Sequence, residues 1–194
     1  MKKLTPHSYE EFLDTFRMDV PATYNFAFDS FDPIAERHPE RKALVHVGPD
    51  HVRRDVSFGF LRRESCRLAN ALQEMGVAKG DRIMLILFRR IEFWTAMLAL
   101  HRLGAVAVPS PNLLTTKDIV YRANFGKLRG VICEDSQAAK VQAARADAPT
   151  LAHLVQTGPG EPQPGWARLE DLRNQAADDF PRPAGAAGRL SLVR

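Results

Sequence analysis

The stretch 82–109, RIMLILFRRIEFWTAMLALHRLGAVAVP, decides the fold. It opens with a continuous apolar run at 83–87, which is typical of a strand buried on both faces of a parallel sheet. The segment 91–103 is apolar nearly all round and is predicted to form a deeply packed helix that ends at Gly104. A second strand follows at 105–109, and its final proline marks where the chain leaves the sheet. Strand, helix and strand in this order predict a parallel βαβ unit.

The same alternation continues toward the C-terminus. A helix is expected to begin near Lys117, with Thr115 or Thr116 as its cap. A strand at 130–133, an alanine-rich helix at 137–146 and a short strand at 151–155 follow. We therefore predict an α/β fold: a doubly wound, largely parallel sheet with helices on both faces.

On the N-terminal side the pattern predicts a helix and a hairpin. Apolar residues between Leu61 and Met75 recur at helical spacing, and Gly76 is well placed to end that helix. The segments 43–47 and 52–57 read as two strands of a hairpin, because the residues between them favour a turn. Before the hairpin, a short helix is expected around 34–37, with Asp32 as its cap and a proline at its first position.

These elements divide the chain into three predicted parts. Residues 1–28 form a lead-in whose aromatic side chains are expected to lie across a larger protein body. Residues 29–156 form the α/β subdomain. Residues 157–194 are expected to contain a loop at 158–165, a short helix over 166–177 and a mobile Pro/Ala/Gly-rich connector over 181–188.

Composition limits the function classes. The hydrophobic fraction of 45% and the charged fraction of 26% are ordinary for a globular protein of 194 residues. The net charge is +4 and the arginine pairs are scattered, which argues against a nucleic-acid-binding tail. Cys66 and Cys133 lack CxxC spacing, which disfavours a disulfide scaffold or a zinc site. Neither a signal peptide nor a membrane span is predicted, and the expected location is cytoplasmic.

Several segments together carry a family resemblance. They are VSFGFL at 56–61, RLANAL at 67–72, GVAKGDRI at 76–83, AMLALHRLGAVAVP at 96–109 and TKDIVYR at 116–122. From about residue 24 to 155 the chain resembles the N-terminal portion of an AMP-forming acyl-CoA synthetase, in the adenylate-forming acyl/aryl-CoA ligase superfamily. The segment 116–122 narrows the likeness to the branch that acts on medium-chain, branched or aromatic acids.

The resemblance implies an activity for the parent family. Its members convert a carboxylic acid, ATP and CoA to acyl-CoA, AMP and pyrophosphate, with Mg²⁺ accompanying the ATP. The Ser/Thr/Gly-rich phosphate loop of that family, which ends in lysine, is absent from this sequence, as are the family's other catalytic motifs. No catalytic residue is therefore transferred, no cofactor-binding residue is assigned, and no cofactor is expected for this chain alone.

Because the sequence stops at Arg194, we expect a truncated synthetase fragment that is inactive by itself. Two alternatives stay open: a non-catalytic binding or regulatory module, and one half of a split synthetase. The expected partner is the remainder of a synthetase, or a second copy of the chain, at an apolar face that truncation would expose. A dinucleotide-binding oxidoreductase is disfavoured, because G-x-G-x-x-G does not occur.

A few residues are weak site candidates. Glu134 and Asp135 follow a strand of an open α/β sheet, where ligands often bind, but a solvated or helix-capping acid is the simpler interpretation. Arg89 and Arg90 lie between a strand and a helix and could attract a phosphate, although a fixed surface pair or a salt bridge is favoured. In relatives a basic residue in the segment after the 130–133 strand can touch CoA, and Lys140 is the lysine nearby.

The histidines and cysteines offer little chemistry. His7, His38, His46, His51, His101 and His153 lack metal-ligand spacing, so no metal site is predicted. His101 is interpreted as a core histidine, and neither cysteine has a motif that suggests a nucleophile.

Overall fold

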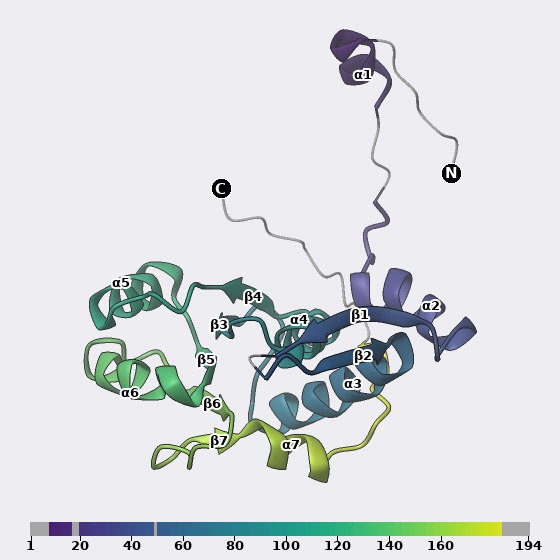
Figure 1. Cartoon of the computed structure of the whole chain (residues 1–194). Coiled ribbons are helices and arrows are strands. Elements are labelled where there is room, and N and C mark those ends of the chain that lie inside the picture. Colours follow the sequence, from purple (N-terminus) through teal and green to yellow (C-terminus); the bar gives the residue numbers. More distant parts are fainter. Residues whose placement is uncertain (1–7, 17–19, 49, 184–194) are drawn as a thin grey trace.

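The computed structural model describes residues 8–16, 20–48 and 50–183. Its centre is a five-stranded sheet in the order β4-β3-β5-β6-β7, in which every neighbouring pair is parallel (Figure 1). The strands are β3 (Arg82–Ile86), β4 (Val106–Pro109), β5 (Gly130–Glu134), β6 (His153–Thr157) and β7 (Ala167–Arg168). The predicted doubly wound α/β fold is confirmed.

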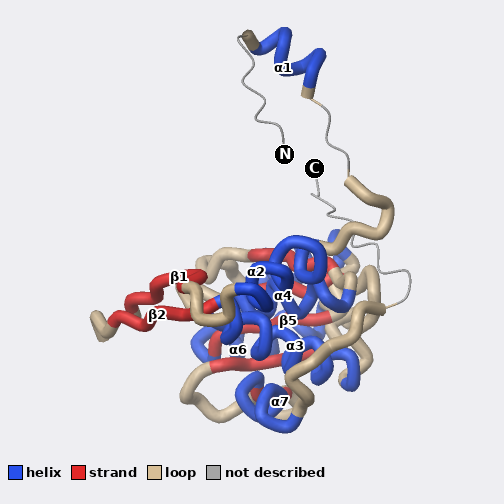
Figure 2. Tube along the Cα trace, turned by 90° about the vertical axis from the view of Figure 1, so that its right-hand side faces the viewer, coloured by secondary structure: helices blue, strands red, loops and turns tan. Residues whose placement is uncertain are grey.

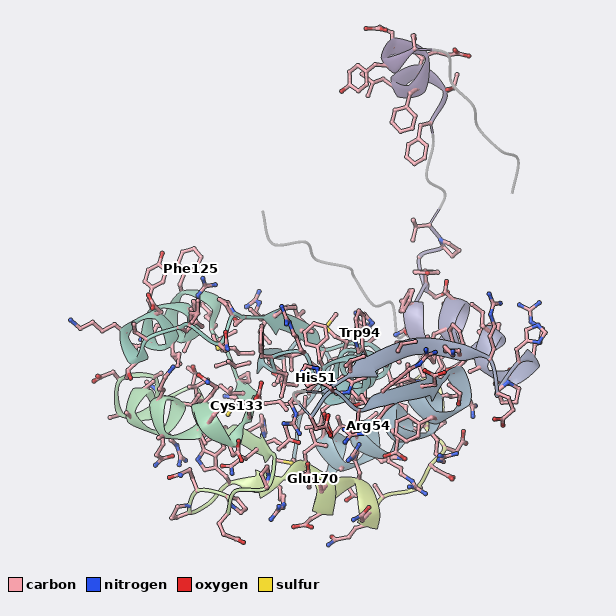
Figure 3. All side chains as sticks on the ribbon, viewed as in Figure 1. His51, Arg54, Trp94, Phe125, Cys133 and Glu170 are labelled. Carbon is pink, nitrogen blue, oxygen red and sulfur yellow. The ribbon has the colours of Figure 1, made fainter. Side chains whose placement is uncertain are left out.

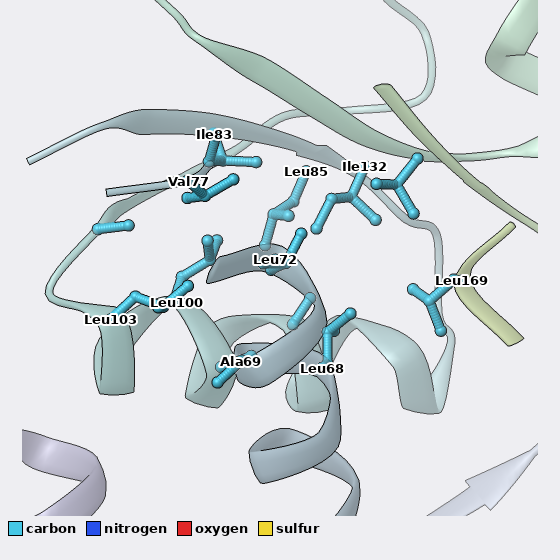
Figure 4. Close-up of a cluster of buried hydrophobic side chains, with 14 of the residues drawn as sticks. Leu68, Ala69, Leu72, Val77, Ile83, Leu85, Leu100, Leu103, Ile132 and Leu169 are labelled. Carbon is cyan, nitrogen blue, oxygen red and sulfur yellow. The ribbon is translucent and has the colours of Figure 1, made fainter. Parts of the chain in front are cut away.

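Helices cover both faces of this sheet. One face carries α3 (Phe58–Glu74), α4 (Ile91–Leu103) and α7 (Leu169–Gln175); the other carries α5 (Thr116–Gly126) and α6 (Asp135–Ala144), which is followed by the short 3₁₀ turn η2 (Arg145–Asp147). Figure 4 shows the first core, in which Leu68 and Leu72 of α3 and Leu100 of α4 pack under the sheet. Burying each such leucine stabilises the fold by about 1.5–3 kcal/mol.

A separate antiparallel hairpin projects from this body. It is made of β1 (Lys42–Val47) and β2 (Arg53–Ser57), as predicted, and Figure 2 shows it extending away from the central sheet. The π-helix η1 (Ala27–Phe31) and α2 (Asp32–Arg37) pack beside the hairpin and share a small apolar core with it. The helix α1 (Tyr9–Thr15) buries no residue and stands apart from the body in Figure 1.

The predicted role of Asp32 as a helix cap is wrong. Because η1 runs directly into α2, the capping position is taken by Phe31, and Asp32 is the first residue of α2. Its carboxylate instead accepts two hydrogen bonds from Arg102 of α4, at 2.6 and 2.7 Å. Arg102 is completely buried and also donates to the Ser65 hydroxyl at 3.1 Å. This buried group joins α2, α3 and α4.

The segment after β6 also differs from prediction. The expected helix over 166–177 starts as the edge strand β7, too short to show a strand pattern, and only 169–175 is helical. Trp166 and Leu169 are buried in the two main cores. The predicted division of the chain at residue 156 stays a prediction, but the segment 157–180 contributes directly to the packing of the α/β body.

The chain from 177 to 182 is anchored on the body, and the expected mobility of the connector over 181–188 stays a prediction. Asn70 of α3 donates to the carbonyls of Ala177 and Asp179, and Phe180 is buried in the core. Arg182 then forms a bidentate pair with Asp29 of η1 at 2.7 and 2.8 Å. The bidentate hydrogen bonds from Arg182 hold the pKa of the Asp29 carboxyl below its usual value. The remainder of the predicted connector, from residue 184, lies outside the described residues.

Candidate functional site

The sheet order places a switch point between β3 and β5. From β3 the chain passes through α4 to β4, which pairs with one edge of β3. From β4 it passes through α5 to β5, which pairs with the other edge of β3, and α4 and α5 cover opposite faces of the sheet. Open α/β sheets bind ligands at the carboxyl ends of the strands at such a point. A cavity of about 670 Å³ lies here, between the ends of these two strands and the β1–β2 hairpin.

The lining of this cavity comes from segments far apart in sequence. The residues after β3 and the last residue of β5 form its base, and the hairpin covers it with His46, His51 and Arg54. Figure 3 labels His51 and Arg54. One nitrogen of His46, Nε2, lies 2.9 Å from the carbonyl oxygen of Arg89, and this contact connects hairpin and sheet. Sequence patterns did not indicate this cover, because the docking of a hairpin onto a distant strand leaves no local signal.

The two acidic candidates lie at the switch point, where they join strand ends. Glu134 accepts the backbone N–H of Phe88 at 2.5 Å, and so bridges β5 to the end of β3. Asp135 accepts the backbone N–H groups of Ser136 at 2.7 Å and Gly160 at 2.9 Å. The loop after β6 passes close to the Asp135 carboxylate, because a Cβ atom on Gly158 would lie only 2.8 Å from it. The structure favours a positioning role over a ligand role for both acids.

The arginine pair is also engaged. Arg90 donates to Glu92 at 3.2 Å, and the Arg89 guanidinium lies over the ring of Phe88, 4.9 Å from its centre. On the hairpin, Arg54 pairs with Asp50 at 3.2 Å. Each guanidinium therefore has a partner within this chain, as the simpler interpretation of the pair predicts.

This charge balance decides what the cavity can hold. The lining holds three arginines and three carboxylates, those of Asp50, Glu92 and Glu134. Arg54 and Arg90 pair with the first two of these acids, and Arg89 lies over the Phe88 ring. Glu92 also lies in the first turn of α4, where its carboxylate compensates the positive end of the helix. Nucleotide phosphates need uncompensated cations and free backbone N–H groups. The described residues therefore do not fit ATP phosphates at the switch point.

Lys140 does not extend toward a ligand. Its ammonium group donates to the backbone carbonyls of Asn112 and Leu114 at 3.4 Å and to the side chain of Gln137 at 3.1 Å. It thereby ties α6 to the loop that precedes α5. The N–H groups of the Lys140 ammonium, with which a lysine would contact CoA, are therefore already used in these hydrogen bonds.

The histidine and cysteine side chains show no catalytic arrangement in the described residues. Burial lowers the pKa of His101, whose ring meets Phe26 edge-on at 5.7 Å. Burial raises the pKa of the Cys133 thiol to about 12 and also raises that of Cys66, so both remain protonated and non-nucleophilic at neutral pH. Within residues 8–16, 20–48 and 50–183, no three His, Cys, Asp or Glu side chains could hold a metal ion together. His7 lies outside these ranges.

Comparisons with known proteins agree with this fold. The family described as AMP-binding enzyme matches residues 31–186, and the chain belongs to that family. Among curated relatives, the mitochondrial acyl-coenzyme A synthetase ACSM5 of Homo sapiens is 32% identical over 169 residues, or 84% of this chain. The mitochondrial acyl-coenzyme A synthetase ACSM3 of Homo sapiens is 31% identical over 177 residues, or 88% of this chain.

Solved structures show the same likeness. The anthranilate CoA ligase AuaEII in complex with anthranoyl-AMP matches with a TM-score of 0.71 and 26% identity, over 85% of this chain and 30% of its own. A benzoate CoA ligase from Burkholderia xenovorans LB400 matches with a TM-score of 0.66 and 25% identity, over 83% of this chain and 30% of its own. The chain likewise spans only 29% of ACSM5 and 30% of ACSM3. It corresponds to the N-terminal part of these enzymes.

Proposed function

We propose that this chain is the N-terminal portion of an AMP-forming acyl-CoA synthetase that acts on medium-chain, branched or aromatic acids in fatty acid metabolism. The family match over residues 31–186 carries the proposal. Support for the branch comes from the names of the relatives, which include acyl-coenzyme A synthetases and two aryl-CoA ligases. The parent reaction would convert a carboxylic acid, ATP and CoA to acyl-CoA, AMP and pyrophosphate.

This portion would supply scaffold and contact surface to the synthetase, and other segments would hold the reacting groups. Glu134 and Asp135 accept backbone N–H groups, Arg90 pairs with Glu92, and the sequence contains no phosphate loop. The substrates ATP and CoA, with Mg²⁺, would bind where other parts of a synthetase meet this one.

Acid-dependent ATP–pyrophosphate exchange tests this proposal. We expect no exchange from the folded 194-residue chain with short, branched, aromatic or medium-chain acids, because it lacks cations placed for the phosphates. We expect exchange from the longest polypeptide that the gene encodes, or from the chain mixed with the product of an adjoining reading frame. Robust exchange by the chain alone, or none in any combination, would contradict the proposal. Circular dichroism of each sample confirms that it is folded.

An apolar groove on the hairpin is the contact surface that we propose for the rest of a synthetase or for a second copy. Val45 and Val47 on β1 are 48% and 57% exposed, and Trp94 at the start of α4 is 52% exposed. These side chains line one groove of about 480 Å³. Exposed apolar surface that gathers in one place marks an interaction site more often than scattered side chains do.

The exposure of this apolar groove can be measured by the binding of a fluorescent dye. The chain is expected to enhance the fluorescence of an anilinonaphthalene sulfonate dye more strongly than a compact monomer of similar size. The double variant Val45→Thr/Val47→Thr keeps β-branched side chains in the strand and should lower that fluorescence clearly. Leu113→Thr, which removes an even more exposed apolar side chain outside the groove, should lower it much less. Equal fluorescence from all three proteins would count against the groove.

We propose a cytoplasmic location for the chain. Cys66 and Cys133 are both buried free thiols, which suits a reducing compartment. The acyl-coenzyme A synthetases ACSM5 and ACSM3 are mitochondrial by name, so cell fractionation is the measurement that separates the two compartments. Within the described residues, no helix has the length and apolar character needed to cross a membrane.

A further inference from the structure

The outer face of α5 carries an exposed aromatic pair. Tyr121 and Phe125 are 67% and 75% exposed, and their rings stack with centres 5.8 Å apart and planes within 11°. The opposite face of the helix buries Ile119 and Ala123 against the sheet. Figure 3 shows Phe125 at the outer edge of α5, pointing away from the body. The pair therefore contributes nothing to the core, although it exposes two large apolar side chains to water.

Cations surround this pair. Lys117 lies one turn before Tyr121 on the same stripe of the helix, Arg122 follows it, and Lys127 caps the C-terminal end of α5. Neither Lys117 nor Lys127 forms a salt bridge within the described part of the chain. With Asp118 as the one acidic residue from 116 to 127, this segment has a net charge of +2.

Asp118 does little to cancel these cations. Its carboxylate accepts the backbone N–H of Thr115 at 2.8 Å and the hydroxyl of Thr115 at 2.7 Å, in a capping box. These bonds, with a weaker contribution from Arg122, lower the pKa of Asp118 and keep its charge at the N-terminal end of the helix. The turn before it adds one more apolar group, because Leu113 is 85% exposed.

Aromatic side chains flanked by lysine and arginine suit the interface of an anionic membrane. Aromatic rings settle at the level of the lipid headgroups, and each nearby cation is attracted to the negative surface. We propose that the outer face of α5, formed by Lys117, Tyr121, Arg122, Phe125 and Lys127, docks the protein reversibly on an anionic lipid surface. This surface is separate from the hairpin groove and from the switch-point cavity.

Two other occupants fit this face less well. A second copy that met it symmetrically would bring two positively charged patches together, and like charges across an interface oppose association. Single-stranded nucleic acid stacks its bases on ring faces. Here Tyr121 and Phe125 stack on each other, so one face of each ring is already covered. Charge and ring geometry together favour a lipid surface.

Vesicle co-sedimentation of the full chain tests the proposal. We expect binding to vesicles of phosphatidylcholine mixed with phosphatidylserine to be about tenfold tighter than to phosphatidylcholine alone, and to weaken in high salt. Tyr121→Ser/Phe125→Ser should weaken binding about tenfold. Lys117→Glu/Lys127→Glu should weaken binding to the anionic vesicles about tenfold and so remove the preference for the anionic lipid.

Matched controls use the same substitutions elsewhere. Tyr9→Ser removes an exposed aromatic ring on α1, outside this face, and Arg37→Glu reverses an exposed charge on α2 at the far side of the body; both should bind as the parent does. Circular dichroism confirms that each variant is folded. No binding to either vesicle, or binding that the α5 variants leave unchanged, would overturn the proposal. The proposal would also be overturned if the parent chain did not bind lipid but formed dimers, or bound a single-stranded oligonucleotide, and the α5 variants abolished that association.

Discussion

Replacing Arg102 with alanine is expected to lower the free energy of unfolding by about 3–5 kcal/mol. The guanidinium is fully buried and makes two hydrogen bonds to Asp32 and one to Ser65. Truncation would leave the Asp32 carboxylate, itself only 6% exposed, without its bidentate partner, and the partly exposed Arg62 at 3.7 Å would be a weaker counter-charge. The loss of contact with the ring of Phe28, 5.3 Å from the guanidinium, adds to the cost. Urea denaturation followed by circular dichroism measures the change.

The matched control is Arg37→Ala. Arg37 lies on α2, close in sequence to Asp32, but its side chain is exposed and donates only to the carbonyl of Pro33. Its replacement should change the free energy of unfolding by about 0.5 kcal/mol or less. The double variant Asp32→Leu/Arg102→Leu should recover much of the loss, because a buried ion pair can often be exchanged for apolar side chains of similar volume. A cost below about 1 kcal/mol for Arg102→Ala would show that water reaches the pair.

The sequence predicted the order of strands and helices because that order rests on local periodicity. Short stretches of sequence are enough to predict such elements. Examples are the apolar run at 83–87, the helix at 91–103 and the helix caps at Thr115 and Gly104. Contacts between distant segments leave no such signal. Arg102 lies inside an otherwise apolar helix, and its partner Asp32 is 70 residues away in the sequence. Because this pairing leaves no local pattern, the sequence indicated only a helix-capping role for Asp32.

The same reasoning accounts for the candidate site. Glu134, Arg89 and Arg90 were correctly placed at strand ends, because strand ends can be predicted from sequence. Their roles depend on the partners that they meet: the backbone N–H of Phe88, the Phe88 ring and the carboxylate of Glu92. The cover that the hairpin forms over them, and the anchoring of the segment 177–182 on α3 and η1, are long-range contacts that no local pattern shows.

Gly130 is expected to be the least replaceable residue of the central strand. Substitution by valine should lower the free energy of unfolding by about 3 kcal/mol, the upper end of the usual cost of overpacking. Gly130 opens β5 and pairs with Ile83 on one side and His153 on the other. A Cβ atom there would overlap the carbonyl oxygen of His153 and would lie 2.8 Å from the His153 Cβ. A backbone carbonyl in a parallel sheet has little freedom to move aside.

The sign of this effect separates two physical arguments. Strand propensity alone favours valine over glycine by about 1 kcal/mol. Valine also reduces the conformational entropy of the unfolded chain, which further favours the folded state. Steric overlap with β6 acts in the opposite direction and is expected to prevail. Gly126→Ala is the control, because its new Cβ would meet only the flexible end of Leu128, at 3.3 Å, and it should be neutral or slightly stabilising. If urea denaturation shows Gly130→Val to be as stable as the parent, β5 and β6 lie farther apart than described, and the loop that carries Gly160 toward Asp135 would be displaced with them.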